Sequence, residues 1–204
     1  MPPKPKFTKE EIVDAALELV REKGMEALTA RELGERLGSS ARPIFTVFNS
    51  MEEVQEEVRA AALKQFESYA KKAMHYTPVF KQVGMQMILF AIEKPKLYQL
   101  VYMSENVGAT DFESIVQRLG DVAQLCVDVI QRDYGLEEKE ARLLFEHVWI
   151  YTFGIGALCA TGMCRFSQEQ IIQMLGQDFM AMLFYAKSGG MNMPTPVPKM
   201  EDLV

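Results

Sequence analysis

Helix-start and helix-stop signals recur at short intervals between Phe7 and Val54, and they constrain the fold more than any other feature of the sequence. Thr8-Lys9-Glu10-Glu11 has the pattern of a capping box, in which a Thr and a Glu three residues later satisfy each other's backbone amides. Gly24 is placed to end the helix that begins there. The pattern predicts a helix from about Lys9 to Lys23.

The same signals predict two further short helices. Thr29-Ala30-Arg31-Glu32 repeats the capping-box pattern and opens a helix that stops at Gly38. After the turn at Gly38-Ser39, Ser40 is the expected N-cap of the next helix, with Pro43 still inside its first turn. Two short helices joined by a tight glycine turn are typical of a DNA-reading helix-turn-helix.

Helical periodicity divides the last of these helices into two faces. We expect an inward face of Ala41, Ile44 and Phe48, and an outward face of Arg42, Phe45, Thr46 and Asn49. The outward side chains suit a DNA groove, since Arg42 can bind guanine or phosphate and Phe45 can contact a thymine methyl group or a sugar. Periodicity leaves open the alternative that Phe45 fills a crevice between neighbouring helices.

Taken together, these segments resemble the TetR family of bacterial transcriptional regulators. The resemblance rests on the capped first helix ending at Gly24 and on the segments Leu28–Leu33, Gly38–Ser40 and Pro43–Ser50. It covers about the first quarter of the chain. The rest resembles the family in length and helical character.

Three positions depart from the family pattern. Members usually carry Tyr where this chain has Phe45, His or Tyr at Val47, and Lys at Met51, and those side chains commonly contact the DNA backbone. The resemblance does not carry these three contacts over to this chain. The predicted DNA-binding residues are Lys4, Lys6, Thr29, Ser39, Ser40, Arg42, Pro43, Phe45, Thr46 and Asn49.

The charge distribution is compatible with a DNA-binding N-terminus. The chain of 204 residues has a net charge of -6, but its first 50 residues carry 8 basic and 8 acidic side chains, so the acidity lies beyond them. Lys4, Lys6 and Lys9 form a basic arm with three prolines. This arm either lies along phosphates or in a minor groove, or is a solvated tail.

Composition also bounds the class of protein. A hydrophobic content of 49% is ample for a core, and the amino terminus has no secretion signal, so we expect a soluble, cytoplasmic protein. The apolar run from Val148 to Ala160 is shorter than the roughly 20 residues that a membrane span requires. Cys126, Cys159 and Cys164 lack paired spacing, which favours buried free thiols over a redox switch.

The remaining sequence predicts an all-α fold. Capping signals and Pro or Gly breaks predict helices at about Met51 to Lys72, Val79 to Glu93, Lys96 to Ser104, Asp111 to Tyr134, Leu136 to Gly162 and Phe166 to Lys187. We expect a DNA-binding domain at 1–50, a helical ligand-binding and dimerisation domain at 51–188, and a flexible tail at 189–204.

The last two predicted helices favour a homodimer. The first of them is apolar nearly all round, so it requires cover on both sides. A two-fold four-helix interface supplies that cover, and TetR-like proteins dimerise through their last two long helices. The alternative is a wholly intramolecular core. Predicted interface residues are Gly154, Leu158, Ile171, Leu175 and Phe179.

The middle helices are expected to enclose a pocket. The chain contains 14 methionines, and Met-rich surfaces adapt to varied apolar ligands. Aromatic side chains supply flat walls, although each is individually more typical of plain core. The predicted ligand-binding residues are His75, Met85, Phe90, Tyr98, Tyr102, Met103, Trp149 and Phe153.

The sequence carries no enzyme signature. It has no G-x-S-x-G, no glycine-rich phosphate loop and no H-E-x-x-H, and its two separated histidines suggest neither a metal site nor a cofactor. A dimeric ligand carrier or adaptor is the alternative function, but it does not need the outward-facing reader. We therefore expect a dimeric, ligand-responsive regulator that binds a DNA operator, and the resemblance implies repression.

Overall fold

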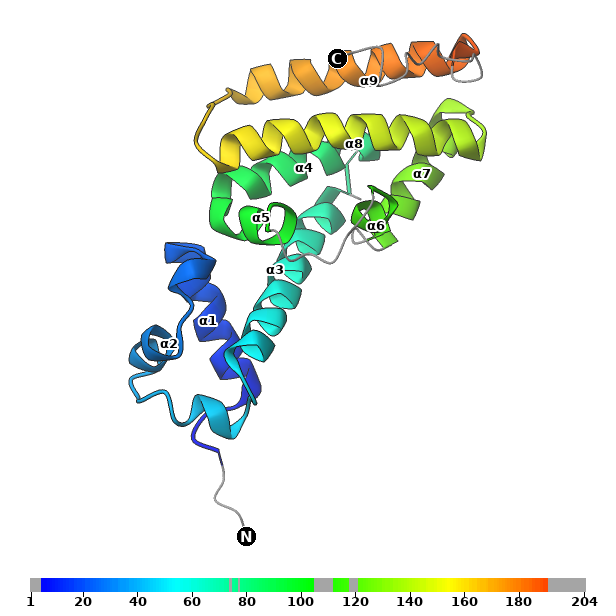
Figure 1. The fold of residues 1–204 in the computed structure, drawn as a ribbon. Helices are drawn as coiled ribbons and strands as arrows, with labels where there is room; N and C mark the ends of the chain where they lie inside the picture. The colour runs from blue at the N-terminus through cyan, green and yellow to red at the C-terminus, as the bar shows by residue number, and fades with distance from the viewer. Residues whose placement is uncertain (1–4, 74, 77, 105–111, 118–120, 191–204) are drawn as a thin grey trace, which may run out of the picture.

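A computed structural model describes residues 5–73, 75–76, 78–104, 112–117 and 121–190. These residues form helices and contain no strand, so the fold is all-α as expected. Figure 1 shows two regions joined by the long helix α3 (Met51–Ala73). The first helices lie at one end of α3, and the last two long helices lie side by side at the other end of the molecule.

The first region begins as its capping signals predict. α1 (Lys9–Lys23) has a complete capping box, in which Thr8 Oγ1 accepts from the amide of Glu11 at 3.2 Å and the Glu11 carboxylate accepts from the amide of Thr8 at 2.8 Å. Gly24 follows with a φ of 88° and begins a turn into the 3-10 helix η1 (Met25–Ala27). α2 (Ala30–Arg36) is capped by Thr29, whose hydroxyl accepts from the amide of Glu32.

The predicted reader helix after Ser40 is shorter than expected. Only the 3-10 helix η2 (Ile44–Thr46) forms there, stabilised mainly by backbone bonds between residues three apart. Pro43 has no amide to donate, and the Thr46 hydroxyl donates to the Pro43 carbonyl at 2.6 Å, which competes with α-helical hydrogen bonding. Ile44, Thr46 and Val47 are also β-branched, which lowers helix propensity. We call residues 39–49 the reader turn.

The middle helices lie close to their predicted positions. α4 (Val79–Glu93) has the predicted bounds, and α5 (Pro95–Tyr102) begins directly after Lys94. The helix predicted from Asp111 to Tyr134 is described over two stretches, α6 (Phe112–Gln117) and α7 (Asp121–Tyr134). Asp111 and residues 118–120 lie outside the described part of the chain.

α8 (Glu138–Ala160) and α9 (Gln168–Lys187) pack against each other, and α8 also packs on α4, α5 and α7. Ser167 and Gln170 form the predicted capping box of α9. α8 is long and apolar enough to cross a membrane by composition, but 44% of its apolar window is buried inside the chain. It is therefore a partly buried core helix. The predicted tail falls mostly on residues 191–204, which lie outside the described residues.

Candidate nucleic-acid interface and ligand cavity

The reader turn divides into the two predicted faces. Ile44 and Phe48 are buried in the main hydrophobic core, while Ala41 is half-buried. Arg42, Phe45, Thr46 and Asn49 are all exposed. Phe45 is 46% exposed, so it does not fill a crevice between the helices.

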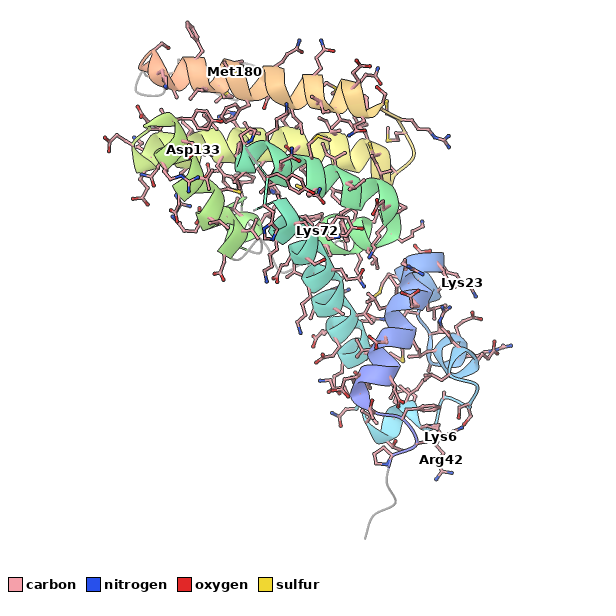
Figure 2. The ribbon with its side chains drawn as sticks, turned by 180° about the vertical axis from the view of Figure 1, so that it is seen from behind. Lys6, Lys23, Arg42, Lys72, Asp133 and Met180 are labelled. Atoms are coloured by element: carbon pink, nitrogen blue, oxygen red, sulfur yellow. The ribbon has the colours of Figure 1, made fainter. Side chains whose placement is uncertain are left out.

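Basic side chains without a carboxylate partner lie at the end of the molecule that carries the reader turn. Most basic side chains of the first two helices form ion pairs, as in Arg31 with Glu35 and Arg36 with Glu22. Among residues 5–58, only Lys6 and Arg42 lack a carboxylate partner. Lys6 Nζ instead donates to Ser39 Oγ at 3.0 Å, which holds the arm against the reader turn. Figure 2 shows Lys6 and Arg42 at the end opposite Met180 of α9.

The other predicted DNA-binding residues differ in exposure and in whether their polar groups already form hydrogen bonds. Ser40 is exposed and Pro43 is half-buried. Thr29 is exposed, but its hydroxyl already caps α2, and the Asn49 amide donates to Glu53 at 3.0 Å. Lys4 lies outside the described residues. The groups readiest to bind phosphate or base edges are therefore Arg42, Lys6 and the Ser40 hydroxyl.

Sequence reasoning missed Gly34, which allows the reader turn to pack on α2. Gly34 is buried, and a Cβ placed on it would lie 2.9 Å from both the Ala41 nitrogen and the Ser40 carbonyl carbon. Such contacts with backbone cannot be relieved by a side-chain rotation. A glycine inside a short capped helix is the signal that would have identified this close approach.

Comparisons with known proteins agree with this geometry. The family model described as bacterial regulatory proteins of the TetR family matches residues 12–58, which include α1, α2 and the reader turn. This match assigns residues 12–58 to the DNA-binding region of the TetR family of transcriptional regulators. The chain's DNA-binding region is therefore a helix-turn-helix, and TetR-family proteins regulate transcription rather than catalyse reactions. No match was found among curated protein sequences.

Two solved structures are similar over almost the whole TetR-like fold. The fatty acid degradation regulator FadR from Bacillus halodurans has a TM-score of 0.60 at 14% identity, covering 90% of this chain and 97% of that one. A TetR variant from Acinetobacter baumannii AYE, in complex with minocycline, has a TM-score of 0.53 at 16% identity, covering 93% and 100%. At these identities, the likeness establishes the shared fold alone.

The second region contains an apolar cavity of about 250 Å³. It lies between α4, α8 and α9, at the end of α7. Five aromatic rings contribute to its wall: Phe80, Tyr134, Phe145, Trp149 and Phe179. Lys81 at the start of α4 is the one charged side chain in the described lining, and Thr152 Oγ1 already donates to the Val148 carbonyl at 2.7 Å.

Only one predicted ligand-binding residue lines this cavity. Trp149 does so, and in the described part of the chain its buried Nε1 has no hydrogen-bond acceptor. Phe90, Tyr98, Tyr102 and Phe153 instead form a connected aromatic cluster beside it, with Trp149 and Phe153 stacked at 5.6 Å between centroids. His75 and Met103 are exposed, and Met85 packs against a separate core cluster.

The aromatic cluster behaves as core. Tyr98 is fully buried and its hydroxyl donates to the Phe153 carbonyl at 3.1 Å. Burial raises the pKa of Tyr98 well above its ordinary value and does the same for Tyr102, whose buried hydroxyl has no partner among the described residues. Both phenols therefore stay protonated at physiological pH. Among the described residues, no group of three His, Cys, Asp or Glu side chains is placed to hold a metal ion.

The predicted dimer residues fall on two different faces. Gly154 and Leu158 are exposed on α8, next to the exposed Ile150 and Tyr151. On α9, however, Ile171 and Leu175 are 3% and 4% exposed and belong to the chain's own core. Phe179 packs against Phe80 and Tyr134 at the cavity. The exposed apolar side chains of α9 are Ile172, Met180, Phe184 and Tyr185.

Proposed function

We propose that this regulator is a homodimeric repressor that binds a palindromic operator and is released when a mostly apolar small molecule occupies the cavity. The observation that carries the DNA-binding part is the surface formed by Lys6, Arg42 and Phe45. It combines two cations that lack carboxylate partners with an exposed aromatic ring. Cations of this kind bind phosphate or guanine, and the ring contacts thymine methyl groups or sugars.

The homodimer is supported by the apolar outer surface of the last two helices, which we call the α8–α9 face. It consists of Ile150, Tyr151, Gly154 and Leu158 on α8, and of Ile172, Met180 and Phe184 on α9. Exposed apolar side chains gathered on two neighbouring helices are costly in water and are typical of a protein interface. Dimerisation would place two reader turns on successive major-groove faces, roughly 34 to 36 Å apart.

The ligand response is supported by the position of the cavity relative to α4. Residues of α4 line one wall of the cavity, whereas none of its described lining belongs to α3. α4 packs along α3 and continues through Lys94 into α5, which contacts α1. A ligand that moves α4 would therefore shift the DNA-binding region through two contacts.

We also propose a domain division at residue 50. α3 begins at Met51, and its first half packs on α1 while its second half packs among the helices that surround the cavity. The residues before it form the DNA-binding domain, and residues 51–188 form the ligand-binding and dimerisation domain.

Selection of bound duplexes from a random pool tests this function. The full-length protein is incubated with the pool, and retained sequences are amplified and aligned. We expect a palindromic consensus whose half-sites are centred about one helical turn apart. Enrichment of no consensus, or of a single non-repeated half-site, would contradict the proposed operator recognition by a dimer. The R42A protein, used in parallel, is expected to enrich the consensus weakly.

A further inference from the structure

The cavity between α4, α8 and α9 has one polar end. We propose that its ligand is an amphipathic organic anion, with an apolar body among the aromatic rings and a single negatively charged group at Lys81. This inference rests on the proposed ligand response, because it names the chemical class of the molecule that the cavity binds.

The body of the ligand follows from the cavity wall. Apart from Lys81, the described lining consists of aromatic, aliphatic, Met, Gly, Pro and Thr side chains, and the Thr152 hydroxyl is already used within α8. An apolar cavity of about 150 Å³ accommodates benzene in another protein. A cavity of about 250 Å³ therefore suits a ligand body of roughly ten non-hydrogen atoms. A strongly polar molecule of that size would lose its hydration without gaining partners.

The charge of the ligand follows from Lys81. Its side chain is half-buried at the cavity and forms no ion pair in the described part of the chain. No acidic side chain lies in the first turn of α4, so nothing there offsets the positive end of the helix dipole. Lys81 and the start of α4 thus favour an anion at the same end of the cavity.

Trp149 provides a signal for ligand binding. It lines the cavity, is 8% exposed, and carries a buried indole N–H without an acceptor in the described part of the chain. Because Trp149 is the only tryptophan, its fluorescence reports directly on occupation of the cavity.

The test compares octanoate with n-octanol, which have similar apolar bodies and differ in charge. Both are titrated into the full-length protein while Trp149 fluorescence is followed. We expect octanoate to bind more tightly than n-octanol. K81Q should weaken octanoate about fivefold, in line with a partly exposed charge pair, and leave n-octanol unchanged. K81R should retain the preference, and K64Q, which removes an exposed lysine from α3, should change neither affinity.

Location is tested by filling the cavity. A Cβ on Gly176 meets no atom within 4 Å, so G176L introduces a side chain into the cavity without a backbone clash. Circular dichroism checks that G176L is folded. The folded variant should bind neither octanoate nor n-octanol. Equal wild-type affinities for the two probes, or equal weakening of both by K81Q, would overturn the inferred anion. If the wild type prefers octanoate but selects no operator, the proposed function fails while the ligand class stands.

Discussion

A Cβ on Gly34 would lie 2.9 Å from the backbone nitrogen of Ala41, so α2 and the reader turn are packed backbone against backbone. This contact positions the exposed Arg42 and Phe45. Because the reader turn contains only a 3-10 helix of three residues, it has few internal hydrogen bonds to hold its shape. Its conformation therefore depends on what it packs against.

Gly34→Ala is expected to lower the free energy of unfolding by about 1 to 3 kcal/mol, because the added methyl group forces two backbone segments apart. Operator binding should weaken as well, since the reader turn moves with its support. Urea denaturation and a fluorescence anisotropy titration measure the two effects. Glu35→Ala is the control in the same helix, because it removes only an exposed ion pair with Arg31 and should leave stability unchanged. Equal stability of G34A and wild type would contradict the close packing.

Arg42→Ala is expected to cost about 1 to 3 kcal/mol of operator binding without affecting the fold. If Arg42 binds phosphate, its loss should weaken binding to all DNA sequences alike. The slope of log affinity against log salt concentration should then fall by about one counterion. If it reads a base, discrimination at one base pair should be lost. Arg31→Ala is the matched control, because Arg31 already pairs with Glu35. An unchanged operator affinity for R42A would remove Arg42 from the interface.

Local signals account for most of the correct predictions. α1 and α4 have the predicted bounds, and the box of Ser167 and Gln170 starts α9 as expected, because capping involves residues only three apart. The reader turn is the main exception. Its sequence has helical periodicity, but Pro43 and the Thr46 hydroxyl both act against α-helical bonding, and periodicity does not include those effects.

Tertiary features were less accessible from the sequence. α9 is apolar on two sides, so periodicity could not determine that Ile171 and Leu175 face the chain's own core rather than the exterior. The cavity depends on how α4, α8 and α9 converge, which no local pattern encodes. Lys81 was overlooked for this reason, although a lysine near the start of an otherwise apolar helix was visible in the sequence.

Phe184→Glu is expected to convert the homodimer to monomers while the chain stays folded. Phe184 is 76% exposed in the single chain, so a carboxylate there costs little until the α8–α9 face is covered. Sedimentation velocity and circular dichroism measure the two properties. Lys64→Glu, on the exposed side of α3, places the same charge elsewhere and should leave the dimer intact. A wild type that sediments as a monomer at micromolar concentration would contradict the dimer.

Phe179→Glu should behave in the opposite way. Phe179 packs against Phe80 and Tyr134, with ring centroids at 5.5 Å and 4.9 Å, so a carboxylate there would disturb the fold itself. We expect a loss of about 2 to 4 kcal/mol in the free energy of unfolding. Urea denaturation of the two variants distinguishes the inward and outward faces of α9. Comparable stability of F179E and F184E would contradict this assignment of faces.

Cys126 is expected to resist alkylation until the protein unfolds. It is fully buried, and burial raises the pKa of its thiol from 9.0 to about 12. Between these values the unfolded chain loses the proton before the folded chain does, so the thiol stabilises the fold below pH 9 and that contribution is lost as the pH rises toward 12. Iodoacetamide labelling with peptide mass analysis should modify the half-buried Cys159 and Cys164 first. Labelling of Cys126 at their rate in the folded protein would contradict this protection.

Lys94→Met is expected to weaken the coupling between ligand and operator while changing neither individual affinity by more than about twofold. Lys94 joins α4 to α5, and its Nζ donates to Gln65 Oε1 on α3 at 2.6 Å and lies 5.6 Å from the Tyr69 ring centroid. α5 then reaches α1, where Lys96 Cδ would lie 3.6 Å from a Cβ on Gly24. Methionine keeps the apolar stem of the side chain and removes the charge that ties these helices together.

The measurement is a thermodynamic cycle. A compound that releases the operator, found by screening, is titrated into free protein and into protein saturated with operator, and the operator is titrated with and without the compound. Linkage requires the same coupling factor from both routes, typically about 1 to 3 kcal/mol. In K94M this factor should fall by about 0.5 to 2 kcal/mol, whereas Lys64→Met should leave it unchanged. If the coupling factor of K94M equals that of the wild type, the ligand acts through α3 without the α4–α5 junction.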